Sequence, residues 1–409
     1  MTDDLGLFGR TDDPPAPRSD GRGARRRARE VQDSQRRRRR RIVLTVTLVV
    51  LILALSASIY GVRALIKLRE VPDYAGPGGA EMILQVNDGE SLSQIGTTLF
   101  SHDGVASVKA FTRAAESDRR IRSVQPGYYQ VRARMSGAAA VERLLDPSAR
   151  VGRLEIRGGE QFDDVGLPNA TTAPGLLTAL SRASCAMIAG TSTCVSPAQL
   201  RATMAETDPA QLGVPNWVAD PMARVDPQRR LEGLLMPGTY DVRPGSSAPE
   251  LLKQVTDKSV TRLLAGGLPN SAAGTGYSPY EVLIIASIIE REAIGPDFGR
   301  VARVIYNRLA AGMQLQMDST INYTLDRPQV RTFPVDRDRP GPYNTYVNKG
   351  LPVAPIGAPS TAAVEAAAHP DPGAWQYFVK CQMDGTSCFS VTIQEHEAAV
   401  NDAVARGVF

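Results

Sequence analysis

The longest apolar run of the chain extends from Ile42 to Val62 and contains 21 residues without a charged side chain. At a rise of 1.5 Å per residue, a helix of that length measures about 31 Å, which matches the roughly 30 Å hydrocarbon core of a bilayer. The run is preceded by 41 residues and lacks a clear small-x-small cleavage site. These features favour an uncleaved anchor over a signal peptide, so we predict a transmembrane helix over residues 42–62.

Residues 1–41 mix Asp, Pro, Gly and Arg with almost no large apolar side chains. Such a composition does not offset the entropy lost on ordering, so we expect a disordered basic tail. The tail ends in six arginines, Arg36 to Arg41. Alone, this block could be a nuclear-localisation or RNA-binding run. Next to an apolar span it predicts a cytoplasmic N-terminus, which leaves residues 63–409 outside the plasma membrane.

The basic charge of the chain is concentrated in this tail. The formal net charge is +4, and residues 1–41 hold 13 arginines against seven acidic residues. The remainder therefore carries 34 basic and 36 acidic side chains. A nucleic-acid-binding domain would need a basic face of its own, so we expect no nucleic-acid partner.

Short amphipathic segments after a linker at residues 63–80 predict a small α+β unit over residues 81–150. We expect a strand at 82–86, helices at 90–100 and 105–115, a turn and strand at 126–132 and a helix at 138–145. The unit resembles a LysM-like peptidoglycan-binding domain in the segment Asn87-Asp-Gly-Glu-Ser-Leu-Ser-Gln-Ile95. Composition and periodicity by themselves indicate only the α+β unit.

Residues 151–265 form a predicted connecting region. A turn, strand and helix at 237–264 repeat the pattern of residues 126–145, which indicates that the chain reuses one local unit. Between the two copies, residues from about 169 to 227 are rich in Ala, Thr and Pro and predict an inserted helical segment. A Gly/Pro/Ser linker at 266–276 leads to the last domain.

All four cysteines lie beyond the apolar span, in two close pairs. They are Cys185 with Cys194, and Cys381 with Cys388. Neither spacing is C-x-x-C and the chain has only three histidines, so we expect no zinc site and no cofactor. Two small-loop disulfides in an oxidising compartment are the stronger interpretation.

A second apolar run, residues 282–289, predicts a buried helix. Ser278 followed by Glu281 is a capping-box pattern, and Pro279 occupies the first helical position, so the helix should begin at Ser278. Only Ser287 interrupts the run, and no polar stripe recurs at helical spacing, so the helix should be surrounded by protein.

Glu290 ends this run and is our candidate catalytic residue. Ala286 and Ser287 lie one turn back and would leave a hollow beside its carboxyl group. Desolvation there would raise the pKa and keep a general acid protonated near neutral pH. The alternative is that Glu290 pairs with an arginine and only ends the helix. Glu292, about 200° round the helix, is a secondary candidate.

A helix predicted at 298–311 carries Asn307, the other secondary candidate. Residues 313–318 then alternate strictly and predict a half-buried strand. Its polar face holds Gln314, Gln316 and Asp318, whose amide and carboxylate groups suit sugar hydroxyls and N-acetyl groups, although a solvated strand face fits the spacing equally well.

Another polar cluster, Tyr343, Asn344, Thr345 and Tyr346, precedes Gly350-Leu-Pro352. It predicts a rigid loop with flat aromatic rings suited to stacking on pyranose faces, and we include its four residues among the candidate substrate-binding residues. A structural loop held by tyrosine hydroxyls is equally compatible with the pattern.

Residues from about Tyr277 to Val400 resemble the endolytic murein transglycosylase family (MltG, YceG-like). The segments that carry this resemblance, in order and spacing, are Ala286-Ser-Ile-Ile-Glu-Arg-Glu292, Tyr306-Asn-Arg-Leu309, Met313-Gln-Leu-Gln-Met-Asp-Ser-Thr320, Tyr343-Asn-Thr-Tyr346, Gly350-Leu-Pro352, Ala354-Pro-Ile356, Ala368-His-Pro370 and Tyr377-Phe378. The single anchor and Glu232-Gly-Leu-Leu-Met-Pro237 extend a looser similarity towards the N-terminus. Ser360 departs from the pattern, because a glycine is expected there.

The resemblance implies a lytic transglycosylase that cuts glycan strands between N-acetylmuramic acid and N-acetylglucosamine, with Glu290 as its acid. It also implies 1,6-anhydromuramyl products. We expect the enzyme to trim or terminate nascent strands, with peptidoglycan synthases as partners; the sequence does not distinguish nascent from mature strands. The competing hypotheses are a muramidase that uses Asp318 as second carboxylate and a glycan-binding scaffold without catalysis. The expected fold is α+β: one transmembrane helix, a small LysM-like module and a larger catalytic domain over residues 277–409.

Overall fold

The computed structural model describes residues 22–69, 71–167, 171–325 and 332–408. The chain divides into two units, Met1–Val71 and Pro72–Phe409.

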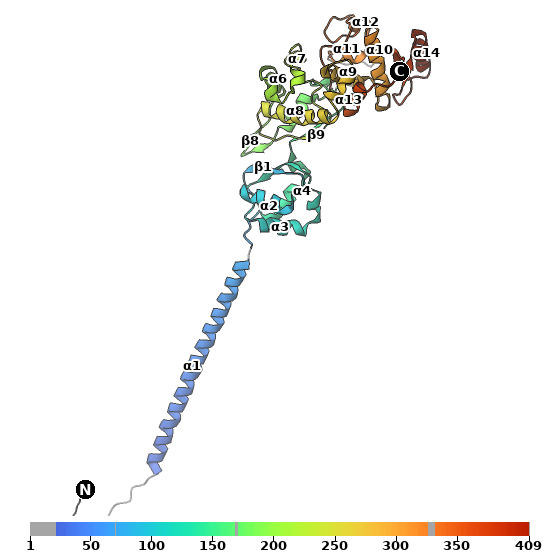
Figure 1. The fold of residues 1–409 in the computed structure, drawn as a ribbon. Helices are drawn as coiled ribbons and strands as arrows, with labels where there is room; N and C mark the ends of the chain where they lie inside the picture. Colours follow the sequence, from blue (N-terminus) through green and yellow to red (C-terminus); the bar gives the residue numbers. More distant parts are fainter. Residues whose placement is uncertain (1–21, 70, 168–170, 326–331, 409) are drawn as a thin grey trace, which may run out of the picture. The chain divides into compact units, whose positions relative to one another are not determined.

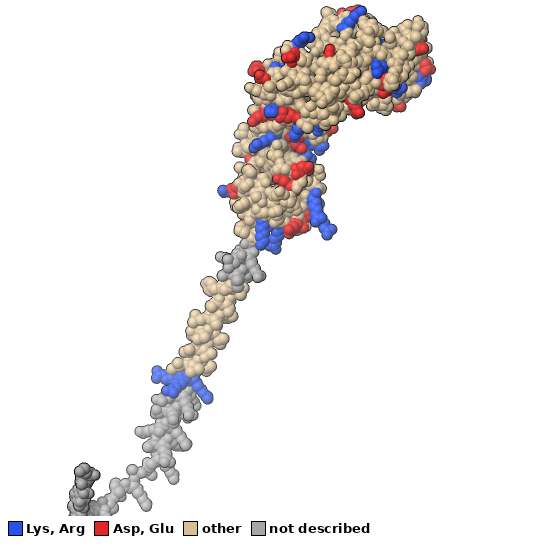
Figure 2. All heavy atoms as spheres, in the orientation of Figure 1, with Lys and Arg blue, Asp and Glu red and all other residues tan. Residues whose placement is uncertain are grey.

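One helix, α1 (Arg22–Arg69), makes up the described part of the first unit (Figure 1). Its segment Arg38–Arg63 reaches a mean hydropathy of 2.8 and is exposed, so it is long and apolar enough to cross a membrane. This segment contains the predicted span of residues 42–62. Arg38 to Arg41 open it and form the basic band on the helix in Figure 2.

The helix is longer than the sequence predicted. Residues 22–41 are helical where we expected a disordered tail, and residues 63–69 continue the helix into the predicted linker. Arg, Ala, Glu and Gln are good helix formers, and extending an existing helix is far easier than nucleating one. The rest of the expected tail, residues 1–21, lies outside the described residues.

The second unit begins with a small module that has its own apolar core. Strands β1 (Glu81–Val86), β2 (Gly127–Arg132) and β3 (Arg150–Val151) form an antiparallel sheet in the order β1-β2-β3. The helices are α2 (Leu92–Ser101), α3 (Val108–Ser117) and α4 (Gly137–Leu145). The predicted α+β unit is therefore confirmed, with Leu84, Phe111 and Val131 in its core.

The connecting region is closed by one ladder. Strand β4 (Arg153–Ile156) pairs antiparallel with β9 (Gly238–Asp241), so the segment between them leaves and rejoins the same sheet. That segment holds the helices α5 (Leu176–Ala183), α6 (Pro197–Glu206) and α7 (Asn216–Met222). It also holds two hairpins, β5 (Val165–Gly166) with β6 (Thr172–Ala173) and β7 (Met187–Ile188) with β8 (Thr191–Ser192).

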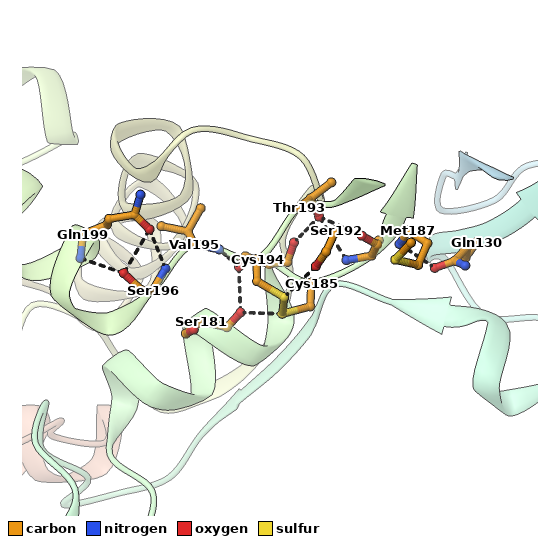
Figure 3. Close-up of a disulfide and its surroundings, with 12 residues drawn as sticks. Gln130, Ser181, Cys185, Met187, Ser192, Thr193, Cys194, Val195, Ser196 and Gln199 are labelled. Carbon is orange, nitrogen blue, oxygen red and sulfur yellow. Dashed lines mark hydrogen bonds between the residues drawn. A yellow bond between two sulfur atoms is a disulfide. The ribbon is translucent and has the colours of Figure 1, made fainter. Parts of the chain in front are cut away.

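The inserted segment is therefore helical, as predicted, but it also contains these hairpins. Leu180, Leu200 and Val218 belong to the same core cluster as the buried helix near residue 285, so the segment packs into the main core. Both predicted disulfides are present, Cys185–Cys194 and Cys381–Cys388. Figure 3 shows the first of them, at the end of α5.

The C-terminal part is built around α9 (Pro279–Glu292). Ser278 caps it and forms the predicted capping box with Glu281, and residues 282–289 are all buried. Around it lie α10 (Phe298–Ala310), α11 (Asp318–Asn322) and α13 (Thr361–Ala368) (Figure 1). The remaining elements are α8 (Ala248–Ala265), α12 (Pro334–Arg337), the hairpin of β10 (Tyr377–Lys380) and β11 (Ser387–Ser390), and α14 (Ile393–Ala405).

Among the described residues, the chain also forms the short 3-10 helices η1 (Arg119–Ser123), η2 (Pro147–Ala149), η3 (Pro209–Leu212), η4 (Asn270–Gly274) and η5 (Gly295–Asp297).

Residues 313–317 do not form the strand that we predicted. Leu315 and Met317 are buried and Gln316 is exposed, so the alternating burial is present. The backbone, however, bonds to a loop instead of a strand: the N–H of Gln316 donates to the carbonyl oxygen of Thr345 at 3.0 Å. Gln316 also has φ of 50°, a left-handed conformation that a regular strand does not contain.

Candidate active site

Two carboxyl groups leave the last turn of α9 on different sides. Glu290 and Glu292 are two residues apart, which is about 200° round the helix, so their side chains meet different parts of the fold. Both are partly buried. Their partners decide what each can do chemically.

The Glu290 carboxylate is held by Ser360. Its Oε2 accepts a hydrogen bond from the Ser360 N–H at 2.9 Å and another from the Ser360 hydroxyl at 2.5 Å. The other oxygen faces Gly158, where an added Cβ would lie 2.1 Å from Oε1. The partner is a serine where the alternative interpretation required an arginine, and both carboxylate oxygens are in close contact with protein.

The part of the expected hollow that lies next to Ser287 is filled. Ser287 is fully buried, and its hydroxyl donates to the carbonyl oxygen of Ile284 at 2.7 Å. The same hydroxyl oxygen accepts a hydrogen bond from the Ile356 N–H at 3.0 Å. The segment around Ile356 therefore occupies the space that small side chains leave on this face of α9.

The Glu292 carboxyl group lies on the side of the predicted polar cluster. Its Oε1 accepts a hydrogen bond from the Ser319 N–H at 3.1 Å. Burial raises the pKa of Glu292, and the nearby negative charge of Asp318 raises it further. These effects outweigh the hydrogen bonds from Ser319 and the positive charge of Lys380, which lower the pKa. Glu292 is thus biased towards its protonated form.

Asp318 and Tyr346, both candidate binding residues, are brought together next to Glu292. The Tyr346 hydroxyl donates to Asp318 Oδ1 at 2.6 Å, and the Thr332 hydroxyl donates to the same oxygen at 2.6 Å. Burial and the bond to Asp318 raise the pKa of Tyr346. The segment from 313 to 318 and the loop from 343 to 346 therefore meet at one point, as a shared site requires.

The two glutamines of that segment remain available. Gln316 is exposed and Gln314 is half-buried. Within the described part of the chain, neither side-chain amide makes a hydrogen bond. Free amide groups at this position can bind a polar ligand.

The other loop residues are buried, which favours the structural alternative for them. Tyr343 is 8% exposed, and its ring packs against Tyr323 with centroids 4.8 Å apart. Asn344 donates to the carbonyl oxygens of Arg337 and Arg339, at 2.9 and 2.6 Å. The Thr345 hydroxyl is also engaged, because it accepts the Met317 N–H at 3.0 Å.

Asn307 likewise has a structural contact. Its side-chain amide donates to the carbonyl oxygens of Gly373 and Trp375, at 3.2 and 2.8 Å, and fixes that loop on α10. The adjacent Arg308, which was not among the candidate residues, donates to the carbonyl oxygens of Gln376 and Leu315. It thereby ties the start of β10 to the 313–317 segment.

A third carboxyl group, Glu232, is buried at 1% exposure and was not assigned a role from the sequence. It accepts hydrogen bonds from the Phe162 N–H at 3.1 Å and from the Tyr323 hydroxyl at 3.0 Å. Burial raises the pKa of Glu232 to about 8, against the lowering effects of Tyr323 and Arg229. The sequence pattern that could have indicated a buried carboxyl group is an acidic residue directly before the apolar stretch Gly233-Leu-Leu-Met236.

Within residues 22–69, 71–167, 171–325 and 332–408, no group of three or more His, Cys, Asp or Glu side chains is arranged to hold a metal ion.

A model of the YceG-like family matches residues 84–402. The chain is 26% identical over 319 residues to the endolytic murein transglycosylase of Bacillus subtilis, which covers 77% of this chain and 83% of that protein. It is 28% identical over 184 residues to the endolytic murein transglycosylase of Streptococcus pneumoniae serotype 2, or 43% of this chain and 32% of that protein.

Among solved structures, a yceG-like protein from Listeria monocytogenes has a TM-score of 0.50 and 24% identity, and the match covers 78% of this chain and 98% of that one. This likeness supports the mixed helix and sheet fold.

Proposed function

The chain belongs to the YceG-like family, whose model matches most of its length, and on this premise we propose that it is a lytic transglycosylase of peptidoglycan. It cleaves glycan strands internally, between N-acetylmuramic acid and N-acetylglucosamine. The relatives in Bacillus subtilis and Streptococcus pneumoniae are named endolytic murein transglycosylases, which supports this activity.

The setting of Glu292 carries the proposal for the catalytic group. A general acid has to hold its proton near neutral pH, and burial together with Asp318 raises the pKa of Glu292. The candidate binding residues Asp318 and Tyr346 lie on its side of α9. We therefore assign the acid to Glu292 in place of Glu290, the residue that the sequence favoured.

One carboxyl group is sufficient for this reaction. Glu292 donates its proton to the glycosidic oxygen as the bond to the anomeric carbon breaks. The resulting carboxylate then accepts the proton of the muramyl C6 hydroxyl, whose oxygen attacks the anomeric carbon and closes a 1,6-anhydro ring. No water is consumed, so no second carboxylate is needed to activate it.

Glu290 acts as a positioning residue in this proposal. Its two hydrogen bonds from Ser360 fix the N-terminus of α13 against the end of α9. Gln314 and Gln316 supply free amides for sugar hydroxyls and N-acetyl groups, and Tyr346 presents a partly buried ring held by Asp318. Glu292 thus faces the groups proposed to hold the glycan.

We also propose where the protein lies in the cell. We propose that the apolar segment of α1 anchors the protein in the plasma membrane, with Arg36 to Arg41 on the cytoplasmic side and residues 63–409 outside. An enzyme held at the membrane surface meets strands as they are made, so nascent glycan is the proposed substrate and peptidoglycan synthases are the proposed neighbours. The module at residues 81–151 is proposed to bind glycan in the LysM-like manner.

A two-carboxylate muramidase is the second candidate, because the charge of Asp318 acts on Glu292. In that case Asp318 would activate water, and the product would carry a reducing end. Against it, the Oδ1 atom of Asp318 already accepts hydroxyl groups from Tyr346 and Thr332.

Mass spectrometry of products separates the candidates. The full-length protein in detergent is incubated with uncrosslinked glycan strands. We expect internal fragments with 1,6-anhydromuramyl ends, two hydrogens and one oxygen lighter than hydrolysed ends. Reducing ends would support the muramidase, and intact strands that bind without cleavage would support a scaffold.

A further inference from the structure

A cavity of about 850 Å³ adjoins the end of α9 on the Glu290 side. Its lining comes from β4 and the loop at residues 157–161, from α5 with Cys185 in the inserted segment, and from Arg291. Pockets of 300–1,000 Å³ typically hold small ligands. None of the residues assigned above to glycan binding lines it.

Three arginines give the cavity free positive charge. Arg153, Arg157 and Arg182 are exposed, and their guanidinium groups make no hydrogen bond or ion pair within the described residues. By contrast, Arg291 is occupied, because its Nη1 donates to the carbonyl oxygen of Gly159 at 3.1 Å and to Gln161 at 3.3 Å. The guanidinium group offers a planar pair of donors that matches a carboxylate.

The cavity also contains negative charge. Glu155 is exposed on β4, and Glu160 accepts the Arg157 N–H at 2.8 Å. Asp163 is engaged elsewhere, in ion pairs with Arg201 and Arg229. Free cations beside two carboxylates match a zwitterionic ligand better than a polyphosphate, because the glutamates repel phosphate groups and attract an amine.

We infer that this cavity binds a short peptide that carries carboxylates and an amine, the chemistry of the peptide attached to muramic acid in peptidoglycan. This inference rests on the proposed function. The arginines take the carboxylates and the glutamates take the amine of the diamino acid. The enzyme would then recognise strands by their peptides as well as by their sugars.

The position of the cavity fits a peptide linked to the cleaved strand. Gly158 of the cavity contacts Glu290, and Arg291 precedes the proposed acid in α9. An extended chain advances about 3.3–3.6 Å per residue, so three residues reach about 10 Å from the sugar. Because Arg291 lines the cavity and Glu292 is the next residue of α9, the cavity lies beside the helix turn that carries the proposed acid.

The inserted segment gains a role from this inference, since its first helix forms one wall. Cys194 ties the end of α5 at Cys185 to the segment before α6 (Figure 3). The Val195 N–H donates to the Ser184 hydroxyl at 2.8 Å, and the Thr193 hydroxyl donates to the Ser184 carbonyl oxygen at 2.8 Å. The wall that carries Arg182 is therefore held in place.

Binding of a free peptide tests the inference without catalysis. The full-length protein in detergent is titrated with a tripeptide of alanine, glutamate and a diamino acid, and separately with inorganic pyrophosphate. We expect the tripeptide to bind and the double variant Arg157→Gln/Arg182→Gln to bind it at least about tenfold more weakly. Arg224→Gln, an exposed arginine after α7 that does not line the cavity, is the matched control and should leave binding unchanged. Binding of pyrophosphate alone, or of neither probe, overturns the inference.

Turnover separates this inference from the proposed function. Strands with peptides and strands from which an amidase has removed the peptides are compared by KM. We expect the double variant to raise KM only for peptide-bearing strands. If the wild type forms anhydro products from both strands with equal KM, the cavity inference fails and the function stands. If the tripeptide binds but no strand is cleaved, the function fails and the cavity inference stands.

Discussion

The two sides of the last turn of α9 differ in what they contact, although their carboxyl groups are only two residues apart. On one side, Glu290 accepts two hydrogen bonds from Ser360 and touches Gly158. On the other, Glu292 accepts one backbone hydrogen bond and lies near Asp318. Burial beside another acid raises the pKa of Glu292, which favours its neutral form. In the proposed function, the same helix therefore presents one carboxyl group for positioning and one for proton transfer.

The largest expected effect comes from Glu292→Gln, which removes the transferable proton but keeps size and polarity. We expect the rate of anhydro-product formation to fall by a factor on the order of 10² to 10⁴. The thermal midpoint should stay close to that of the wild type. Glu290→Gln is the matched control, and a larger loss of turnover in that variant would return the acid to Glu290.

Glu232 extends the comparison to a carboxyl with no solvent contact. Its folded pKa of about 8 lies above the ordinary value of 4.5, so the native state binds more protons than the unfolded state between these pH values. The free energy of unfolding should therefore fall as pH rises from about 4.5 to about 8, by a few kcal/mol at about 1.4 kcal/mol per pKa unit. Glu232→Gln should flatten this fall in denaturant titrations across that range. If the free energy of unfolding of the variant fell with pH as steeply as that of the wild type, the raised pKa of Glu232 would be contradicted.

Glu290→Gln should reduce stability more than turnover. A neutral amide replaces the charged acceptor of two hydrogen bonds, and we expect the free energy of unfolding to drop by about 1–3 kcal/mol. Ser360→Ala and the double variant complete a mutant cycle measured by urea unfolding. Additive losses would show that the two side chains do not interact, because contacting residues are expected to couple.

The smallest effect is expected for Gln316. Gln316→Asn shortens the side chain but keeps its amide group. Asparagine also tolerates the left-handed backbone conformation of this position. We expect KM for glycan strands to rise roughly fivefold with kcat nearly unchanged, the mark of lost uniform binding. Steady-state kinetics checks this. A fall in kcat at constant KM would contradict this expectation, because it would show that Gln316 interacts with the glycan only in the transition state.

Local rules predicted what depends on local sequence. The cap at Ser278, the buried face of α9 and the cysteine pairs at short separation all follow from residues close to one another in the chain. The alternating burial at Leu315 to Met317 was also predicted, because it depends on side-chain polarity.

Contacts from distant segments account for the differences. The 313–317 segment finds its hydrogen-bond partners in the loop near Thr345, so it needs no neighbouring strand. The sequence predicted the direction in which Glu292 leaves α9. It did not predict which residues contact the Glu292 carboxyl group. In the sequence, Ser360 was notable only because a glycine was expected at its position. In the structure, Ser360 donates hydrogen bonds to Glu290, and Ser319 donates one to Glu292.

The ladder of β4 and β9 has a consequence for the time course of folding. It pairs Ile156 with Gly238, so the whole intervening segment must be synthesised before the ladder can close. Closing so long a loop carries an entropic cost that precedes any gain from the paired strands. For a chain that emerges N-terminus first, the small module at residues 81–151 can complete its sheet while this ladder is still open, so the sheet of the module should form before the β4-β9 ladder.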